Sequence, residues 1–512
     1  MTEVLFTHSY FLAFDPKEER AMMPYPPLGT LYAAAVARDG GYSVALFDAM
    51  LARSEKELED HLVRHRPWFL VIYDDDFNYL TKMCLTRMRQ AAFAMSEIGK
   101  RHGCMVIVHG SDPTDHLDSY FDHGADYILI GEAERTLLEL LDALTGKSAT
   151  PPRAIPGVAE RQRDGAIVRG AKREPLRDLD QLPMPARDLV DIERYRSVWR
   201  EHHGRFSMNI VTTRGCPFHC NWCAKPLYGQ VYHSHSPARI AREIEEIARL
   251  WNPDHLWFCD DIFGLRPGWI EELAKEVESR GIRIPFKCLS RADLLQRDET
   301  VDALRRAGCT TIWIGAESGS QAVLDAMEKG TTVEQIHIAT VKLRAAGIRV
   351  GFFLQFGYPG EGAREIEQTL RMVRRARPDE IGISVSYPLP GTRFHERVRA
   401  EMGEKRNWSE SSDLAMMFRG AYSTEFYRLL ARYVHMDHRL AQGEHALGQL
   451  LRQRALPTRA GARRIVLSPY YLARRALLSL RMRKLQIARA PSPVRSSAPV
   501  TIELPVERIQ EN

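Results

Sequence analysis

Short apolar segments alternate with helical segments along most of this chain of 512 residues, and this alternation limits the fold more than any other feature. Strand–helix repeats build parallel sheets, because two parallel neighbours must be joined by a long crossover, usually a helix. Residues 3–145 contain five such strands, which read VLFTH, YSVALFDA, WFLVIY, CMVIVHG and ADYILIG. We therefore predict an α/β protein that begins with a parallel sheet covered by helices on both faces.

A second series of strand–helix units runs from SMNIVTT, which begins at residue 207, to EIGISVSY, which ends at residue 387. It contains six units, whereas complete eight-unit barrels usually need about 250 residues. We therefore predict a partial (β/α)6 barrel whose working residues lie in the loops after the strands. The predicted organisation is an N-terminal domain in 1–145, a linker with a small hairpin in 146–195, the barrel in 196–405, a mainly helical region in 406–489 and a disordered tail in 490–512.

The composition indicates a soluble globular protein, because 44% of the residues are hydrophobic and 27% are charged. The first residues lack the pattern of a signal peptide, and no apolar run reaches about 18 residues, so we expect a cytoplasmic protein. Eight cysteines in so long a chain do not suggest a disulfide framework. Five of them are expected to be buried packing residues, namely Cys84, Cys104, Cys259, Cys288 and Cys309.

The other three cysteines, Cys216, Cys220 and Cys223, have the spacing C-x3-C-x2-C in a loop directly after the first barrel strand. A structural zinc site normally has four protein ligands, and His219 is too crowded by its cysteine neighbours to complete one. A simple electron-transfer cluster normally has four cysteines too. We favour a four-iron cluster with one open iron, because the open position gives the missing fourth cysteine a function.

The cysteine loop resembles that of the radical S-adenosylmethionine (SAM) enzymes, whose motif is C-x3-C-x-aromatic-C, with Trp222 here at the aromatic position. In that family the cluster is [4Fe-4S], and its open iron binds SAM, which is cleaved reductively to a 5′-deoxyadenosyl radical. The likeness continues at the barrel strand ends in WFCDDIF, CLSRADLL, IGAESGS, FFLQFGYPGE and YPLPGTRFHE. It implies a cofactor-binding set of Trp222, Asp260, Asp261, Ser290, Arg291, Glu317, Ser318, Gln355 and Gly357.

The N-terminal domain resembles the flavodoxin-like, cobalamin-binding module found ahead of one large radical SAM subgroup. The likeness is carried by PYPPLGTLYAAAVARDGGYSVALFDA and GADYILIGEAERTLLELLDAL. It implies cobalamin contacts at Pro27, Leu28, Gly29, Asp75, Asp76, Gly110, Ser111, Gly131 and Glu132. The D-x-H-x-x-G motif of another cobalamin family is absent around His8, so we expect cobalt without a protein imidazole ligand. The loop YDDDFNY is our candidate for the surface under the corrin ring, and a solvated acidic loop is the alternative interpretation.

That subgroup includes enzymes of the anaerobic magnesium-protoporphyrin ester cyclase type and many cobalamin-dependent methyltransferases. The resemblance therefore implies an enzyme, and we expect methylation of an unactivated carbon in a small-molecule or lipid-like substrate. An external reductant such as flavodoxin or ferredoxin would supply electrons. A cyclase or rearrangement enzyme without net methylation is the alternative, and a sensor that uses cobalamin and a cluster is a third hypothesis. The sequence identifies no catalytic side chain.

The C-terminal region is strongly basic, since no acidic residue occurs between Glu444 and Glu503. Such a block is typical of a solvated helical face, a nucleic-acid site, a site for an acidic partner or a helix on an anionic membrane. We do not expect nucleic acid, because no RNA-binding module accompanies the block. The segment RIVLSPYYLARRALLSLRMRKLQI mixes Leu, Ile and Tyr with Arg and Lys. A solvated face is its simplest interpretation, and peripheral membrane contact is the alternative.

Overall fold

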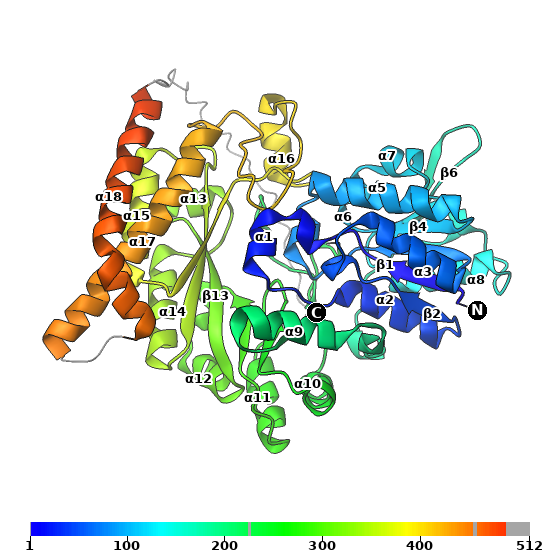
Figure 1. The fold of residues 1–512 in the computed structure, drawn as a ribbon, viewed down its shortest axis with the longest axis horizontal. Helices are drawn as coiled ribbons and strands as arrows, with labels where there is room; N and C mark the ends of the chain where they lie inside the picture. The colour runs from blue at the N-terminus through cyan, green and yellow to red at the C-terminus, as the bar shows by residue number, and fades with distance from the viewer. Residues whose placement is uncertain (1, 224–226, 454–457, 488–512) are drawn as a thin grey trace, which may run out of the picture.

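The protein has two lobes that lie side by side in Figure 1, a smaller one built on the N-terminal sheet and a larger one built on a curved sheet backed by helices. The structure is a computed structural model, and it describes residues 2–223, 227–453 and 458–487. The tail that we predict to be disordered, 490–512, lies outside the described residues. The α/β fold class predicted from the sequence is confirmed.

The N-terminal sheet has the strand order β2-β1-β3-β4-β5-β6-β7. Its five parallel strands are those predicted: β1 (Val4–Thr7), β2 (Val44–Leu46), β3 (Phe69–Tyr73), β4 (Met105–His109) and β5 (Tyr127–Leu129). The hairpin predicted in the linker forms β6 (Val158–Arg161) and β7 (Ile167–Arg169), which continue this sheet antiparallel to β5. The strand order reverses between β1 and β3, and open α/β sheets bind ligands outside the carboxyl ends at such a point.

Helices cover both faces of this sheet: α2 (Leu28–Asp39), α3 (Leu58–His65), α5 (Thr86–Arg101), α7 (Leu117–Asp122) and α8 (Glu134–Leu144). The shorter α1 (Pro16–Ala21), α4 (Tyr79–Lys82) and α6 (Ser111–Asp115) lie beyond the carboxyl ends of the strands, toward the larger lobe. The sequence of residues 80–103 predicts a single long helix, and this prediction is wrong, because the chain breaks between α4 and α5. Cys84 adopts a left-handed φ of 52°, and the amide of Thr86 donates to the carbonyl of Trp408 at 2.9 Å. The break therefore belongs to a contact with the distant C-terminal segment.

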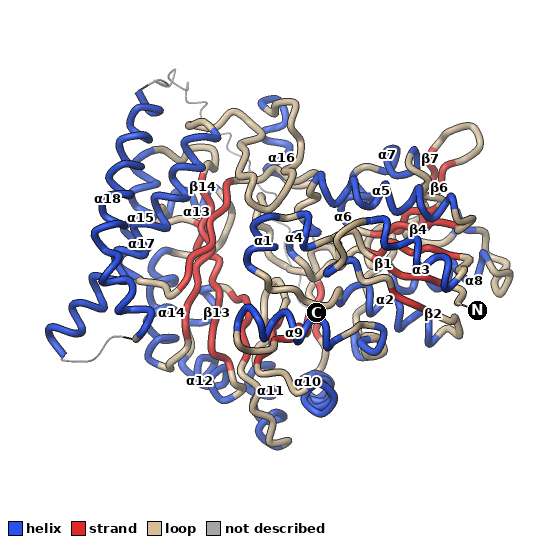
Figure 2. Tube along the Cα trace, in the orientation of Figure 1, coloured by secondary structure: helices blue, strands red, loops and turns tan. Residues whose placement is uncertain are grey.

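The second sheet has six parallel strands in the order β15-β14-β13-β12-β11-β8, which confirms the predicted partial barrel. These strands are β8 (Ser207–Ile210), β11 (His255–Phe258), β12 (Phe286–Ser290), β13 (Cys309–Glu317), β14 (Arg349–Phe356) and β15 (Glu380–Val385). The outer face is covered by α10 (Pro237–Trp251), α11 (Trp269–Ser279), α12 (Asp298–Arg306), α14 (Val333–Ala345) and α15 (Ala363–Ala376), with α13 (Gln321–Ala326) near the carboxyl end of β13. Figure 2 shows how far β13 and β14 extend through the middle of the larger lobe.

The C-terminal part adds α16 (Arg393–Val398), α17 (Thr424–Gln453) and α18 (Arg459–Ile487). The last two pack along each other outside α14 and α15 (Figure 1). The helical region predicted from residue 406 begins only at Thr424, because the preceding segment makes irregular contacts such as the one with α5. Among the described residues, no helix has both the length and the apolar character that crossing a membrane requires.

The N-terminal lobe also covers the edge of the barrel sheet that is formed by its terminal strand, β8. The side-chain amide of Asn209 donates to the carbonyl of Pro26 at 2.8 Å. The indole of Trp199, in the linker helix α9 (Ile192–His203), donates to the carbonyl of Pro24 at 2.7 Å. An uncovered edge strand would offer unpaired backbone groups to other chains, so these contacts protect the edge and fix one lobe against the other.

Candidate active site

The cysteine loop leaves the barrel through the short strand β9 (Thr213–Arg214), which pairs with β10 (His233–Ser234) on the loop's return. Gly215 turns the chain between strand and loop with a φ of 80°. A Cβ atom there would lie 2.2 Å from the carbonyl oxygen of Val231, so only glycine fits. The loop is thereby held open around its three cysteines.

Asn221 fixes the middle of the loop, between the second and third cysteines. Its amide nitrogen donates to the carbonyl of Ala326 at 2.9 Å, and its amide oxygen accepts from the hydroxyl of Tyr358 at 2.9 Å. Its backbone N–H donates to the carbonyl of Met327. Two separate segments of the barrel therefore position one residue of the loop, although no motif in the sequence singled it out.

Cys216, Cys220 and Cys223 all line one cavity of about 1020 Å³ that lies between the two lobes. None of the three is fully buried, whereas the five cysteines predicted to be packing residues are all buried, which confirms the burial predicted for those five. Although Cys223 is exposed as a residue, loss of solvent around its thiol raises the pKa to about 12, and the nearby Asp261 and Cys220 add to the effect. Binding to iron would therefore release the thiol proton.

The arrangement of the thiols fits a multi-iron cluster. Within the described ranges, no three Cys, His, Asp or Glu side chains converge as the ligands of a single metal ion would. In a cubane cluster each thiolate binds a different iron, so thiols that share a cavity without converging suit that group. The indole nitrogen of Trp222 is buried without a hydrogen-bond partner and lines the same cavity, so it could donate to a bound group.

Cations surround the thiols and would offset the negative charge of a thiolate-bound cluster. A guanidinium nitrogen of Arg291 lies 4.0 Å from the Cys220 sulfur, and its carbon lies 3.5 Å above the ring of Phe218. The ammonium of Lys329 is bonded to Glu317 at 3.0 Å. Burial opposes the charge of Lys329, but the attraction of Glu317 outweighs it and raises its pKa.

The structure brings some of the predicted SAM residues to the cavity and leaves others behind it. Trp222, Asp261, Ser290, Arg291 and Glu317 line the cavity. Glu317 has a left-handed φ of 54° after a register shift in β13, the kind of backbone strain that gathers at functional sites.

The remaining predicted residues of the barrel are buried behind the cavity wall. Asp260 accepts hydrogen bonds from the amide of Thr212 and the hydroxyl of Thr213, and burial raises its pKa to about 7. Ser318, Gln355 and Gly357 are bonded within the barrel. Of the two adjacent aspartates, only Asp261 lines the cavity.

Lys82 is a cavity residue that sequence reasoning missed. It comes from α4 of the N-terminal lobe, and its ammonium donates to both oxygens of Asp261, at 2.7 and 2.9 Å. Burial opposes its charge, but the ion pair with Asp261 outweighs this and raises the pKa of Lys82. No local pattern could reveal the pair, because its members are 179 residues apart.

The predicted cobalamin residues are divided in the same way. Gly131 and Glu132, after β5, line the cavity, and Ser111 lines a small adjoining one. Buried away from both are Pro27, Leu28, Gly29, Asp75, Asp76 and Gly110. Asp75 accepts the amide of Gly29 at 2.8 Å, so part of the YDDDFNY loop is used to brace the N-terminal lobe.

Arg214, two residues ahead of the first cysteine, joins the lobes at the inner edge of the cavity. It is 3% exposed, is paired with Glu132, and donates to Glu134 at 2.6 and 3.1 Å. Burial favours a neutral Glu134, but the charge of Arg214 outweighs it and lowers the pKa of the carboxyl. The aromatic rings of Tyr32 and Tyr228 enclose the guanidinium.

Comparison with known families decides what this cavity is. Residues 210–373, which include the cysteine loop and four of the five strands that follow it in the sheet, match the family described as the Radical SAM superfamily. The chain contains a radical SAM domain. This confirms the resemblance drawn from the sequence, together with the [4Fe-4S] cluster and SAM that the family binds.

The alignments with two relatives extend beyond the radical SAM domain. An uncharacterized methyltransferase of Pyrococcus horikoshii is 26% identical over 377 residues, covering 72% of this chain and 78% of the relative. An anaerobic magnesium-protoporphyrin IX monomethyl ester cyclase of Rubrivivax gelatinosus is 24% identical over 392 residues, covering 74% and 67%. The cobalamin-dependent SAM radical enzyme OxsB, solved with aqua-cobalamin and SAM, has a TM-score of 0.67 at 17% identity and covers 95% of this chain and 80% of OxsB. The likeness to OxsB shows that both lobes share a fold with that protein.

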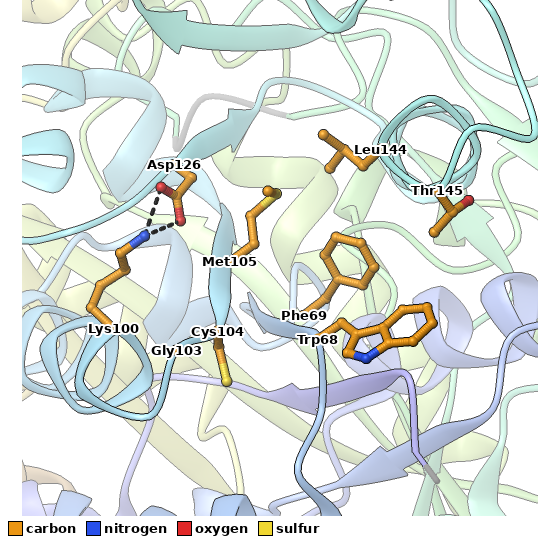
Figure 3. A pocket seen from close by; sticks show the side chains of 9 residues that line it. All are labelled: Trp68, Phe69, Lys100, Gly103, Cys104, Met105, Asp126, Leu144 and Thr145. Carbon is orange, nitrogen blue, oxygen red and sulfur yellow. Dashed lines mark hydrogen bonds and ion pairs between the residues drawn. The ribbon is translucent and has the colours of Figure 1, made fainter.

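A separate cavity of about 450 Å³ lies at the amino ends of β3 and β4 (Figure 3). Trp68 and Phe69 form one side, and an ion pair between Lys100 and Asp126 at 2.8 Å forms the other. The cysteines lie beyond the opposite, carboxyl ends of the sheet, where α/β sheets bind ligands. We therefore assign this cavity no part in the radical SAM site.

Proposed function

We propose that this protein is a cobalamin-dependent radical SAM enzyme that methylates an unactivated carbon of its substrate. The observation that carries the proposal is the cavity in which the three cysteines of the barrel face residues of the N-terminal lobe. A cluster with SAM and a cobalamin held by the other lobe could both reach one substrate there. The relatives named as a methyltransferase and as a cyclase support cofactor chemistry of this kind.

In this proposal the chain holds and orients its cofactors. When bound, the cluster supplies the electron that cleaves SAM to methionine and a 5′-deoxyadenosyl radical, and cobalamin supplies a methyl group. Cys216, Cys220 and Cys223 would hold the cluster. Asp261 would accept from the ammonium of SAM, while Ser290, Arg291 and Glu317 offer further polar groups at the same cavity. Gly131 and Glu132 would face cobalamin from the other wall.

The net reaction balances with two molecules of SAM and two electrons for each substrate molecule. One SAM yields methionine and 5′-deoxyadenosine, which gains the hydrogen removed from the substrate carbon. The other SAM donates the methyl group that replaces this hydrogen and becomes S-adenosylhomocysteine. An external reductant such as flavodoxin or ferredoxin would supply both electrons.

Aromatic side chains on the concave face of the barrel support the proposal that the substrate is a small molecule with an apolar or lipid-like part. The rings of Trp313 and Phe353 stack with centroids 4.7 Å apart and line the cavity. Trp313 lies against Gly351, where a Cβ atom would be 2.4 Å from the indole, so this glycine lets the ring lie flat on the sheet. Phe353 remains 39% exposed, which leaves an aromatic surface for a ligand. We also propose that the basic C-terminal helices contact a membrane surface, because a lipid-like substrate would reside in the membrane.

Asp261→Asn is expected to weaken SAM binding by at least about tenfold, because a charge-assisted hydrogen bond contributes roughly 1.5–3 kcal/mol. Titration calorimetry on the anaerobic, cluster-containing protein measures the effect. The neighbouring Asp260→Asn serves as the matched control, since that carboxyl supports the backbone of Thr212 and does not line the cavity. Equal SAM affinity in Asp261→Asn and the unchanged protein would contradict the role given to Asp261.

Product analysis separates methylation from the alternatives. We expect anaerobic turnover with substrate to form 5′-deoxyadenosine and S-adenosylhomocysteine in about equal amounts, with the latter dependent on added cobalamin. Mass spectrometry with methyl-labelled SAM follows the transferred group. A product without the label and without S-adenosylhomocysteine would favour a cyclase, and tight SAM binding with no cleavage even with substrate would favour a sensor.

A further inference from the structure

The outer face of α18 is apolar although it points away from the protein. Val466, Tyr470, Leu477 and Leu480 are between 40% and 77% exposed and recur at spacings of three, four and seven residues. This is the period of one helix face. Among the described residues, seven of the fifteen exposed large hydrophobic side chains lie between Leu447 and Leu480. Five of these seven lie on α18 and the other two, Leu447 and Leu451, lie on α17, so apolar exposure of this kind is concentrated on the last two helices.

The inner face of the same helix is already used for folding. Tyr471 and Leu478 are buried, and Met482 and Leu485 pack against the hydrophobic core. Gly443 of α17 brings the two helices close, because a Cβ atom there would lie 2.6 Å from the hydroxyl of Ser468. Since the inner face suffices to attach α18, the second apolar stripe is not needed for that attachment.

Basic side chains flank the outer stripe along its whole length. These exposed residues are Arg463, Arg474, Arg481, Arg483 and Lys484. In the described part of the chain none of them forms a salt bridge, whereas the inner Arg475 pairs with Asp437. The helix itself contains no acidic residue. From residue 463 to residue 484 the face extends roughly 32 Å, at about 1.5 Å per residue.

The charge decides between the possible occupants of this face. A second copy of the chain, related by a two-fold axis, would place arginines against arginines with no acidic residue of α18 between them. A nucleic acid would be held by the cations, but it would leave the exposed leucines and valine without apolar contacts. An anionic bilayer satisfies both sets, because headgroup phosphates meet the cations while apolar side chains enter the acyl boundary.

We propose that the outer face of α18 docks the protein on anionic lipid bilayers, with Val466, Leu477 and Leu480 inserted and Arg463, Arg474 and Arg481 at the headgroups. α18 lies at the outer edge of the larger lobe (Figure 1), and the exposure of its apolar stripe leaves this face open to a bilayer. The inference rests on the proposed peripheral membrane contact, but it is independent of the proposed reaction, since binding requires neither SAM cleavage nor substrate.

Co-sedimentation of the full chain with phosphatidylcholine vesicles, with and without phosphatidylglycerol, tests the docking. We expect binding only with phosphatidylglycerol and a loss of binding as salt is raised. Changing Arg463, Arg474 and Arg481 to Gln should weaken binding about a hundredfold, because each basic residue near an anionic surface contributes roughly fivefold. Changing Val466, Leu477 and Leu480 to Ser should weaken it at least about tenfold.

A matched control removes three exposed apolar side chains elsewhere, in Val63→Ser, Leu250→Ser and Val341→Ser together, and should bind as the unchanged protein does. Circular dichroism and SAM binding establish that each variant is folded. The proposal is overturned if the protein does not bind at low salt, if pure phosphatidylcholine binds it equally, or if the control loses as much as the α18 variants. It is also overturned if the serine variant instead converts a dimer to a monomer in light scattering. SAM cleavage can fail or succeed without affecting any of these results.

Discussion

Cys216→Ala is expected to abolish reductive cleavage of SAM by this protein. Loss of a residue that only supports a metal ligand typically costs 10–100-fold, so loss of a ligand itself should lower 5′-deoxyadenosine formation by more than about a hundredfold. The cavity offers no obvious replacement, because within the described residues no further cysteine lines it beside Cys220 and Cys223. The measurements are 5′-deoxyadenosine by mass spectrometry and the electron paramagnetic resonance signal of the reduced cluster.

Cys309→Ala provides the control for this experiment, because that cysteine is 5% exposed and lies in the barrel sheet. It should keep both the cluster signal and SAM cleavage, with at most a modest loss of stability from the small cavity that it creates. The assignment of the cluster ligands is wrong if Cys216→Ala retains a cluster that cleaves SAM, or if both variants lose the cluster to the same extent.

Arg214→Met is expected to lower the free energy of unfolding by about 3–5 kcal/mol, because it leaves the buried carboxylates of Glu132 and Glu134 without their cation. Chemical unfolding followed by tryptophan fluorescence measures the change. Replacing both glutamates by Gln in the same protein should recover part of the loss, since no buried charge then remains unpaired.

Arg306→Met is the matched control for this second prediction. Arg306 also pairs with two acids, Glu278 and Asp302, but at the surface, where such pairs contribute at most about 1 kcal/mol. The structural importance given to Arg214 would be refuted if its loss cost no more than that of Arg306.

The sequence allows the sheets to be predicted because their strands are local patterns of apolar residues. All eleven predicted strands occur in the structure: five, β1 to β5, lie in the first sheet, and the other six form the barrel sheet. The hairpin predicted in the linker is found as well. The cysteine spacing is equally local. Helix ends were predicted less well where distant segments determine them, as at Cys84 between α4 and α5.

Only the site residues that belong to local motifs or follow predicted strands could be predicted from the sequence. Asp260 and Asp261 are neighbours in the same motif, and only the structure shows that one carboxyl is turned toward Thr212 and the other toward the cavity. The partnerships of Lys82 and Arg214 join residues 179 and at least 80 positions apart, so they arise from the packing of the lobes and leave no pattern along the chain.

The position of Arg214 also affects how large molecules can enter the cavity between the lobes. If the lobes moved apart, Arg214 would lose its ion pairs with Glu132 and Glu134, and the adjoining Cys216 would be displaced as well. We therefore expect the lobes to remain closed while ligands come and go. Ligands would instead pass between the segments that line the same cavity away from Arg214, such as linker residues 169–173 and the turn at 391–393. Cofactor loading and substrate exchange would then depend on the linker, a segment that takes no part in the chemistry.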